Sequence, residues 1–253
     1  MLRTDYLFLD VETVPMCNQF SEIGERLQKL FLKKFAKDIE SAMSDADASV
    51  KAEEIHNKVW QRTAGLHAEF NRIVCISIGM FLPAADGGKR MRFRVKALTD
   101  GNEASLMLKF HSVITQSKPT TIIGHNGKGF DFPLLSRKFL MHKLSLPTVF
   151  NTIGKKPWEV SHLDTMEMWA FGEWNKRTSL DLLAATFNIP TPKDVMDGSE
   201  VRGYFYEKEK GPEDHFSQKG LDQIGVYCNK DVVTCAQVHC ALTGEDPFSF
   251  DII

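Results

Sequence analysis

The sequence contains no apolar run that approaches the ~18 residues of a membrane-spanning helix. Its N-terminus lacks the succession of charged, apolar and small residues that makes up a signal peptide. Cysteine is scarce, since the five present are odd in number and form no CxxC pair. This usage favours reduced, mostly buried thiols over a disulfide framework. Together these absences predict a cytoplasmic protein.

Two common site types also have little support. Cys235, His239 and Cys240 could contribute to a zinc site, but no second cluster completes a set of four ligands. The stretch GHNGKGFDF, residues 124–132, indicates a glycine-rich loop but lacks the GK[ST] ending of a phosphate-binding P-loop. There is no internal repeat and no low-complexity linker. We therefore expect one domain over residues 1–253.

Charge is close to balanced over the whole chain but uneven along it. With a formal net charge of −2, the protein is not a polycation that binds anions through its overall charge. Residues 128–156 nevertheless carry six lysines and arginines against a single acid, Asp131. Such an excess fits an anionic partner, and it fits a solvated face equally well.

Hydrophobic patterning predicts an α/β domain with a mixed sheet covered by helices. We expect strands at residues 4–12, 73–81, 91–97, 120–124 and 161–165, the second and third of them paired as a hairpin. Helices are expected at residues 21–42, 49–63, 102–116, 132–142, 179–187 and 219–242. The first two of these helices form a helical insertion at about 21–66, directly after the first strand.

Acidic residues stand out at three places in apolar surroundings. The stretch TDYLFLDVETVP, residues 4–15, ends a core strand with Asp10 and Glu12, which point to the same side because they are two apart. Asp131 lies between two phenylalanines. Tyr227 and Asp231 are four apart, so they share one face of a helix. Taken singly, these groups could be exposed acids, a helix cap and a local hydrogen bond.

One chemistry accounts for all four carboxylates at once. Buried carboxylates repel one another and are costly to desolvate unless cations neutralise them. Hard divalent cations such as Mg²⁺ and Mn²⁺ prefer oxygen ligands. Two such ions about 3.5–4 Å apart can hold the attacking and leaving oxygens of a phosphodiester. The acids therefore favour metal-assisted phosphodiester hydrolysis.

Three motifs in the same order resemble those of the DnaQ-like, or DEDD, 3′–5′ exonucleases: Asp10-x-Glu12, Asn126-x3-Phe130-Asp131 and Tyr227-x3-Asp231. A tyrosine four residues before the last acid is typical of the DEDDy branch. The sequence is most similar to predicted 3′–5′ exonucleases related to the proofreading domain of family B DNA polymerases. The stretches SLDLLAATFNIP (179–190) and MDGSEV (196–201) also resemble that group.

The resemblance implies a ribonuclease H-like fold with a mixed sheet of about five strands. It implies two divalent ions, Mg²⁺ or Mn²⁺, held by four catalytic carboxylates, Asp10, Glu12, Asp131 and Asp231. The fifth catalytic residue, Tyr227, would orient the attacking water. Three further residues, Thr13, Asn126 and Phe130, would bind the substrate.

The expected function is that of a stand-alone, metal-dependent 3′–5′ exonuclease. Its partner would be the 3′ end of a nucleic acid, with single-stranded DNA favoured. Two alternatives remain: trimming of RNA by the same fold, and a non-catalytic nucleic-acid-binding module. The insertion could restrict the cleft to single strands, bind a protein partner or extend the core.

Overall fold

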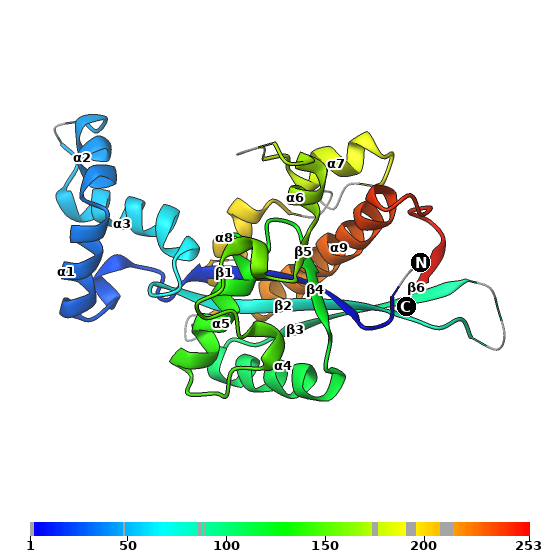
Figure 1. Ribbon diagram of the computed structural model, residues 1–253. Helices are drawn as coiled ribbons and strands as arrows, with labels where there is room; N and C mark the ends of the chain where they lie inside the picture. The colour runs from blue at the N-terminus through cyan, green and yellow to red at the C-terminus, as the bar shows by residue number, and fades with distance from the viewer. Residues whose placement is uncertain are drawn as a thin grey trace.

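A six-stranded mixed sheet forms the centre of the molecule, with the strand order β5-β4-β1-β2-β3-β6 (Figure 1). The computed structural model describes residues 3–47, 49–85, 88, 90–173, 177–190, 196–207 and 215–253. The strands are β1 (Tyr6–Pro15), β2 (Asn71–Leu82), β3 (Met91–Thr99), β4 (Thr121–Gly124), β5 (Leu163–Asp164) and β6 (Phe250–Ile252). The expected mixed sheet is confirmed. The sixth strand was not expected, because three residues are too few for a period-two pattern.

Two helical layers cover the sheet, and the alternation along β1 shows which side chains face each layer. Leu7, Leu9 and Val11 pack against α4 (Glu103–Ser117) and α5 (Asp131–Met141). Phe8 and Val14 face the other side, against α9 (Gln218–Leu242) and α8 (Val201–Tyr206). Two further helices, α6 (Thr165–Ala170) and α7 (Leu180–Thr186), contact α9. The even-numbered positions between Phe8 and Val14 therefore point toward α9.

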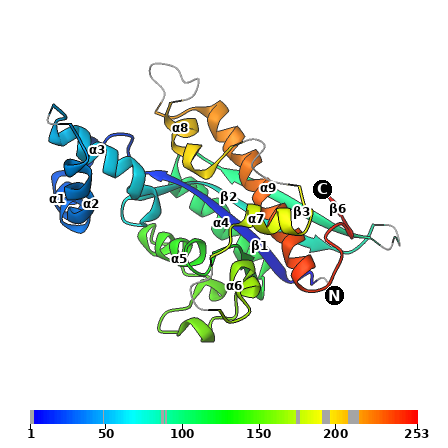
Figure 2. The same ribbon diagram turned by 90° about the horizontal axis from the view of Figure 1, so that it is seen from above.

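The segment between β1 and β2 is a helical insertion, residues 16–70, that projects from one end of the sheet (Figures 1 and 2). It contains η1 (Phe20–Glu22), α1 (Glu25–Lys34), α2 (Ala36–Ser44), α3 (Ala52–Thr63) and η2 (Ala64–Leu66). Phe31 and Trp60 are fully buried in a separate apolar core inside it. The single helix expected at 21–42 is wrong, because the chain breaks at Phe35. The Phe31 and Phe35 rings, four residues apart, lie 4.6 Å from each other at the break.

A buried ion pair links α5 to α4 and to the start of β2. Lys138 Nζ on α5 lies 3.0 Å from Glu103 Oε1 on α4 and donates to the Asn71 carbonyl oxygen at 2.6 Å. The backbone N–H of Ile73 donates to the same Glu103 oxygen at 2.6 Å. Lys138 is therefore not available to a partner, although it belongs to the basic stretch 128–156. Lys128 of that stretch forms an ion pair as well, with Glu167 at 2.6 Å.

The cysteines are all free, and four of the five are buried, as expected for reduced thiols. Among the helices of the described ranges, none is both long and apolar enough to cross a membrane.

Candidate active site

Asp10 and Glu12 lie on the α9 side of β1 and meet a third group there, the thiol of Cys228. One ligand atom from each of these three residues lies within 4.8 Å of the others. The Cys228 thiol donates to Asp10 Oδ2 at 3.2 Å. Sequence reasoning missed Cys228, although it directly follows Tyr227 and shares the buried face of the last helix. In the described part of the chain this is the one group of acids, cysteines and histidines close enough to hold a metal ion. Accordingly, Cys235, His239 and Cys240 form no such group.

A bulge next to the acids shapes the strand that carries them. Glu12 pairs with Cys75, whereas Thr13 pairs with Ile73, so Val74 of β2 is an extra residue without a partner on β1. Val74 and Cys75 are both buried in the apolar cluster under α8 and α9. Bulges of this kind bend a strand and redirect its side chains. Beyond the bulge β1 continues to Pro15, so the expected end of the strand at residue 12 is wrong.

Asp131 is the first residue of α5 and is only 5% exposed. The loop before it is held by another acid, Asp164. The Asp164 carboxylate accepts hydrogen bonds from the backbone N–H groups of Asn126 at 2.8 Å and Lys128 at 3.1 Å. It also caps α6 by accepting from the N–H of Met166 at 3.0 Å. Asp164 thus fixes the loop that delivers Asp131.

Tyr227 and Asp231 lie one turn apart on α9, and both side chains are buried. Burial, followed by the negative charges of Asp231 and Glu12, raises the pKa of the Tyr227 phenol. The phenol therefore keeps its proton at neutral pH and remains a hydrogen-bond donor.

The carboxylates influence one another strongly. Burial raises the pKa of Asp10 to about 6, while the thiol of Cys228 acts in the opposite direction. Burial and then the charges of Asp10 and Asp231 raise the pKa of Glu12 well above its usual range. Burial and then Asp10 do the same to Asp131. These mutual effects place all four acids within electrostatic reach of one another.

This donor set fits divalent cations. Within the described residues, no lysine, arginine or histidine forms an ion pair with Asp10, Glu12 or Asp131. Carboxylate oxygens are the ligands that Mg²⁺, Mn²⁺ and Ca²⁺ prefer, and a bound cation would offset both the desolvation and the repulsion. A thiol is a softer ligand than a carboxylate and suits a hard cation less well. In this structure Cys228 instead donates a hydrogen bond to Asp10.

The three expected substrate-binding residues have different surroundings. Phe130 is half-buried and lines a groove of about 550 Å³ that also contains Glu12 and Thr13; this is called the site groove below. Thr13 Oγ1 donates to the Gly65 carbonyl oxygen at 2.7 Å, so its proton is engaged by the insertion. Asn126 is exposed, has a left-handed backbone with φ 60°, and does not line the site groove.

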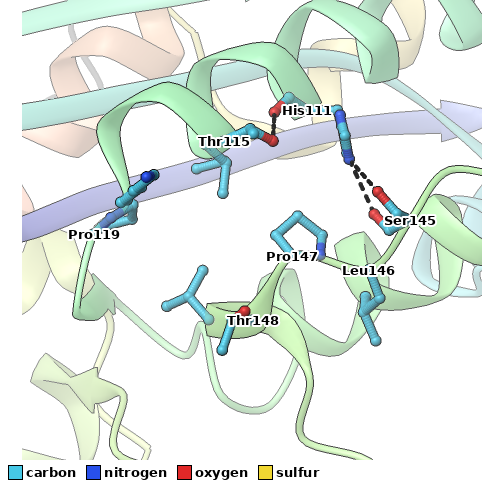
Figure 3. Close-up of a pocket in the computed structure, with 10 residues that line it drawn as sticks. His111, Thr115, Pro119, Ser145, Leu146, Pro147 and Thr148 are labelled. Carbon is cyan, nitrogen blue, oxygen red and sulfur yellow. Dashed lines mark hydrogen bonds between the residues drawn. The ribbon is translucent and has the colours of Figure 1, made fainter.

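A second cavity lies elsewhere on the molecule. It measures about 450 Å³ and lies between the last turns of α4 and the segment 145–149 (Figure 3). His111 Nε2 crosses it to the Ser145 hydroxyl at 2.9 Å. None of the four acids lines this cavity.

Comparison with known proteins supplies a family and a fold. A family model described as a predicted 3′–5′ exonuclease related to the exonuclease domain of PolB matches residues 64–243, which include Asp131, Tyr227 and Asp231 but not β1. No curated protein matches the sequence.

Among solved structures, the family B DNA polymerase from the hyperthermophilic archaeon Pyrobaculum calidifontis is similar, with a TM-score of 0.50 and 14% sequence identity. The likeness covers 98% of this chain but only 26% of the polymerase, so the chain spans about a quarter of that protein. At this identity the likeness shows the fold alone, a ribonuclease H-like fold as expected.

Proposed function

This chain belongs to the family of predicted 3′–5′ exonucleases related to the exonuclease domain of PolB, and from that premise we propose that it is a stand-alone, metal-dependent enzyme of the DEDDy type. It removes nucleotides stepwise from the 3′ end of a nucleic acid, with single-stranded DNA as the favoured substrate. Residues 1–253 form one exonuclease domain that acts in the cytoplasm, where free thiols stay reduced. The observation that carries the proposal is the group formed by Asp10 and Glu12 on one side of β1, with ligand atoms within 4.8 Å of each other and of Cys228. The charges of Asp131 and Asp231 add to those that raise the pKa of Glu12, and Glu12 lines the site groove.

Asp10, Glu12, Asp131 and Asp231 would hold two divalent ions, Mg²⁺ or Mn²⁺. When bound, these ions lower the pKa of a water molecule and stabilise the charge that develops on the phosphoryl oxygens. The carboxylates gain as well, because the cations remove the repulsion that raises their pKa values. Cys228 holds Asp10 in its rotamer through the thiol hydrogen bond.

The remaining residues orient the reactants. Tyr227 carries its proton at neutral pH, and it lies one turn before Asp231 on α9. From this position it orients the attacking water by a hydrogen bond. Phe130 presents a half-buried ring in the site groove, where a base can stack; such stacking is worth about 1–3 kcal/mol per base and tolerates any sequence.

Labelled oligonucleotides test the proposal directly. DNA and RNA strands, labelled at either the 3′ or the 5′ end, are incubated with Mg²⁺, Mn²⁺ or EDTA and resolved by length. We expect metal-dependent, stepwise loss from the 3′ end, faster on DNA than on RNA. Faster degradation of RNA would assign the chain to RNA trimming instead. Metal-independent cleavage, or loss from the 5′ end, would contradict the mechanism.

A matched pair of variants separates chemistry from folding. Asp231→Asn should reduce turnover at least about a thousandfold, because it removes a metal-binding charge from the site. Asp222→Asn on the exposed side of the same helix is the control and should keep full activity. Binding of oligonucleotides without cleavage by the unaltered protein would identify a non-catalytic module.

A further inference from the structure

The site groove is built in part by segments that lie outside the three acid-bearing motifs. Its floor contains Glu12 of β1, and Phe130 contributes from the loop before α5. The insertion supplies Arg62 at the end of α3 and Leu66 in η2. The beginning of α8 supplies Arg202. Figure 2 shows α3 and α8 close to the C-terminal end of β1.

Hydrogen bonds hold these walls in place. The Gly65 carbonyl oxygen accepts from Thr13 Oγ1 at 2.7 Å and from Asn71 Nδ2 at 2.9 Å, which ties η2 to both strands. Arg202 Nη1 donates to Asn18 Oδ1 at 2.6 Å, which ties α8 to the start of the insertion. These bonds connect η2 to β1 and β2, and α8 to the insertion.

The side chains that the insertion contributes lack strong protein contacts of their own. Leu66 is 64% exposed, although it is a large apolar residue. Arg62 has a side chain that is 61% exposed, and its ion pair with Asp38 is long, at 3.4 Å. Exposed pairs of this kind contribute about 0–1 kcal/mol, so the guanidinium can exchange Asp38 for another anion at little cost.

We propose that the insertion forms one wall of the channel for the substrate strand, with Arg62 bound to a backbone phosphate and Leu66 packed against the terminal nucleotides. This inference rests on the proposed function and names its substrate contacts. The occupant is the 3′-terminal segment of a single strand, because the groove includes Glu12 and because the weakly paired guanidinium of Arg62 lines the same groove. A volume of about 550 Å³ falls in the range of small-ligand pockets, about 300–1,000 Å³, and so accommodates a ligand of nucleotide size.

Binding without cleavage tests the assignment. The fluorescence anisotropy of a 5′-labelled oligothymidine is titrated with protein in EDTA, at several salt concentrations. Arg62→Ala should raise Kd about three- to tenfold and lower the slope of log K against log[salt] by about 0.7, the value for one phosphate contact on a single strand. Arg62→Lys should restore the slope. Leu66→Ala should weaken binding without changing the slope, since it carries no charge.

The chain offers a matched control and a direct map. Arg26 is exposed on α1 in the same insertion but does not line the site groove, so Arg26→Ala should bind as the unaltered protein does. With 4-thiothymidine at the 3′ terminus, ultraviolet cross-linking should label a peptide that contains residues 61–66.

The outcomes separate the two levels of the argument. If the unaltered protein cleaves 3′ ends but Arg62→Ala keeps its Kd and its salt slope, this inference is wrong and the proposed function stands. Cross-links confined to peptides outside the insertion would also overturn the inference alone. If the unaltered protein neither binds nor cleaves, both fail.

Discussion

Replacing Asp10 by Asn should stabilise the protein in the absence of divalent cations, although it removes a group that we place at the centre of catalysis. The pKa of Asp10 is raised from 3.8 to about 6, chiefly by burial. A difference of about two units at 1.36 kcal/mol per unit corresponds to at most about 3 kcal/mol at neutral pH. Because Asp10 is partly exposed to water, we expect a gain of about 1–3 kcal/mol in the free energy of unfolding.

The sign of the pH dependence follows from the direction of the shift. The native carboxyl group binds its proton more tightly than the unfolded chain does. The free energy of unfolding contributed by Asp10 therefore falls as pH rises from about 4 to about 6, and it stays low above that range. The Asn variant lacks this loss, so its advantage should be large at pH 7.5 and small at pH 4.5.

Urea unfolding in EDTA at these two pH values measures the effect. Asp222→Asn, an exposed change on α9, is the control for removing a negative charge and should leave the free energy of unfolding nearly unchanged. Adding Mn²⁺ should stabilise the unaltered protein and have little effect on Asp10→Asn. The reasoning fails if Asp10→Asn is no more stable than the unaltered protein at pH 7.5, or if its advantage persists at pH 4.5.

Three further changes probe the groups that position the acids. Cys228→Ala removes the thiol that donates a hydrogen bond to Asp10. Steady-state kinetics should show a kcat about two- to tenfold lower, and Cys228→Ser should restore it in part. An unchanged kcat would mean that the thiol contributes only to packing. Asp164→Asn weakens the hydrogen bonds that its carboxylate accepts from the backbone amides of loop 126–128. Thermal unfolding should show a free energy of unfolding lower by about 1–3 kcal/mol. A stability equal to that of the unaltered protein would refute this role. Tyr227→Phe should slow single-turnover hydrolysis about tenfold without abolishing it, whereas an equal rate would contradict the orienting role of the hydroxyl.

Much of the secondary structure could be predicted from the local periodicity of apolar residues. The apolar run Leu7–Leu9 in β1, the long last helix and the order of elements follow from patterns within single segments. The same holds for the acids, since a two-residue spacing on a strand and a four-residue spacing on a helix decide which face each side chain occupies. These rules need no knowledge of the neighbouring segments.

Other features depend on contacts between distant segments and could not be read in this way. The thiol of Cys228 gains its meaning only when α9 packs against β1 and brings it to Asp10. The bulge at Val74 is a mismatch between two strands, which neither strand shows alone. The break at Phe35 lies where α1 and α2 share one aromatic core. It could not be predicted from the sequence, because the four-residue spacing of apolar residues continues unchanged across it.

The insertion leaves and rejoins the sheet at adjacent points. Pro15 and Asn71 are paired across β1 and β2, and the N–H of Met16 donates to the Phe70 carbonyl oxygen at 2.8 Å. Its ends thus close like those of a hairpin, and chain entropy changes slowly with loop length, by only about 0.6 kcal/mol per doubling. The segment can therefore be replaced without moving the sheet. A short turn in its place would keep the register of Asp10 and Glu12 and would open one side of the groove. Helices of another sequence in its place would change which nucleic-acid strands reach the acids.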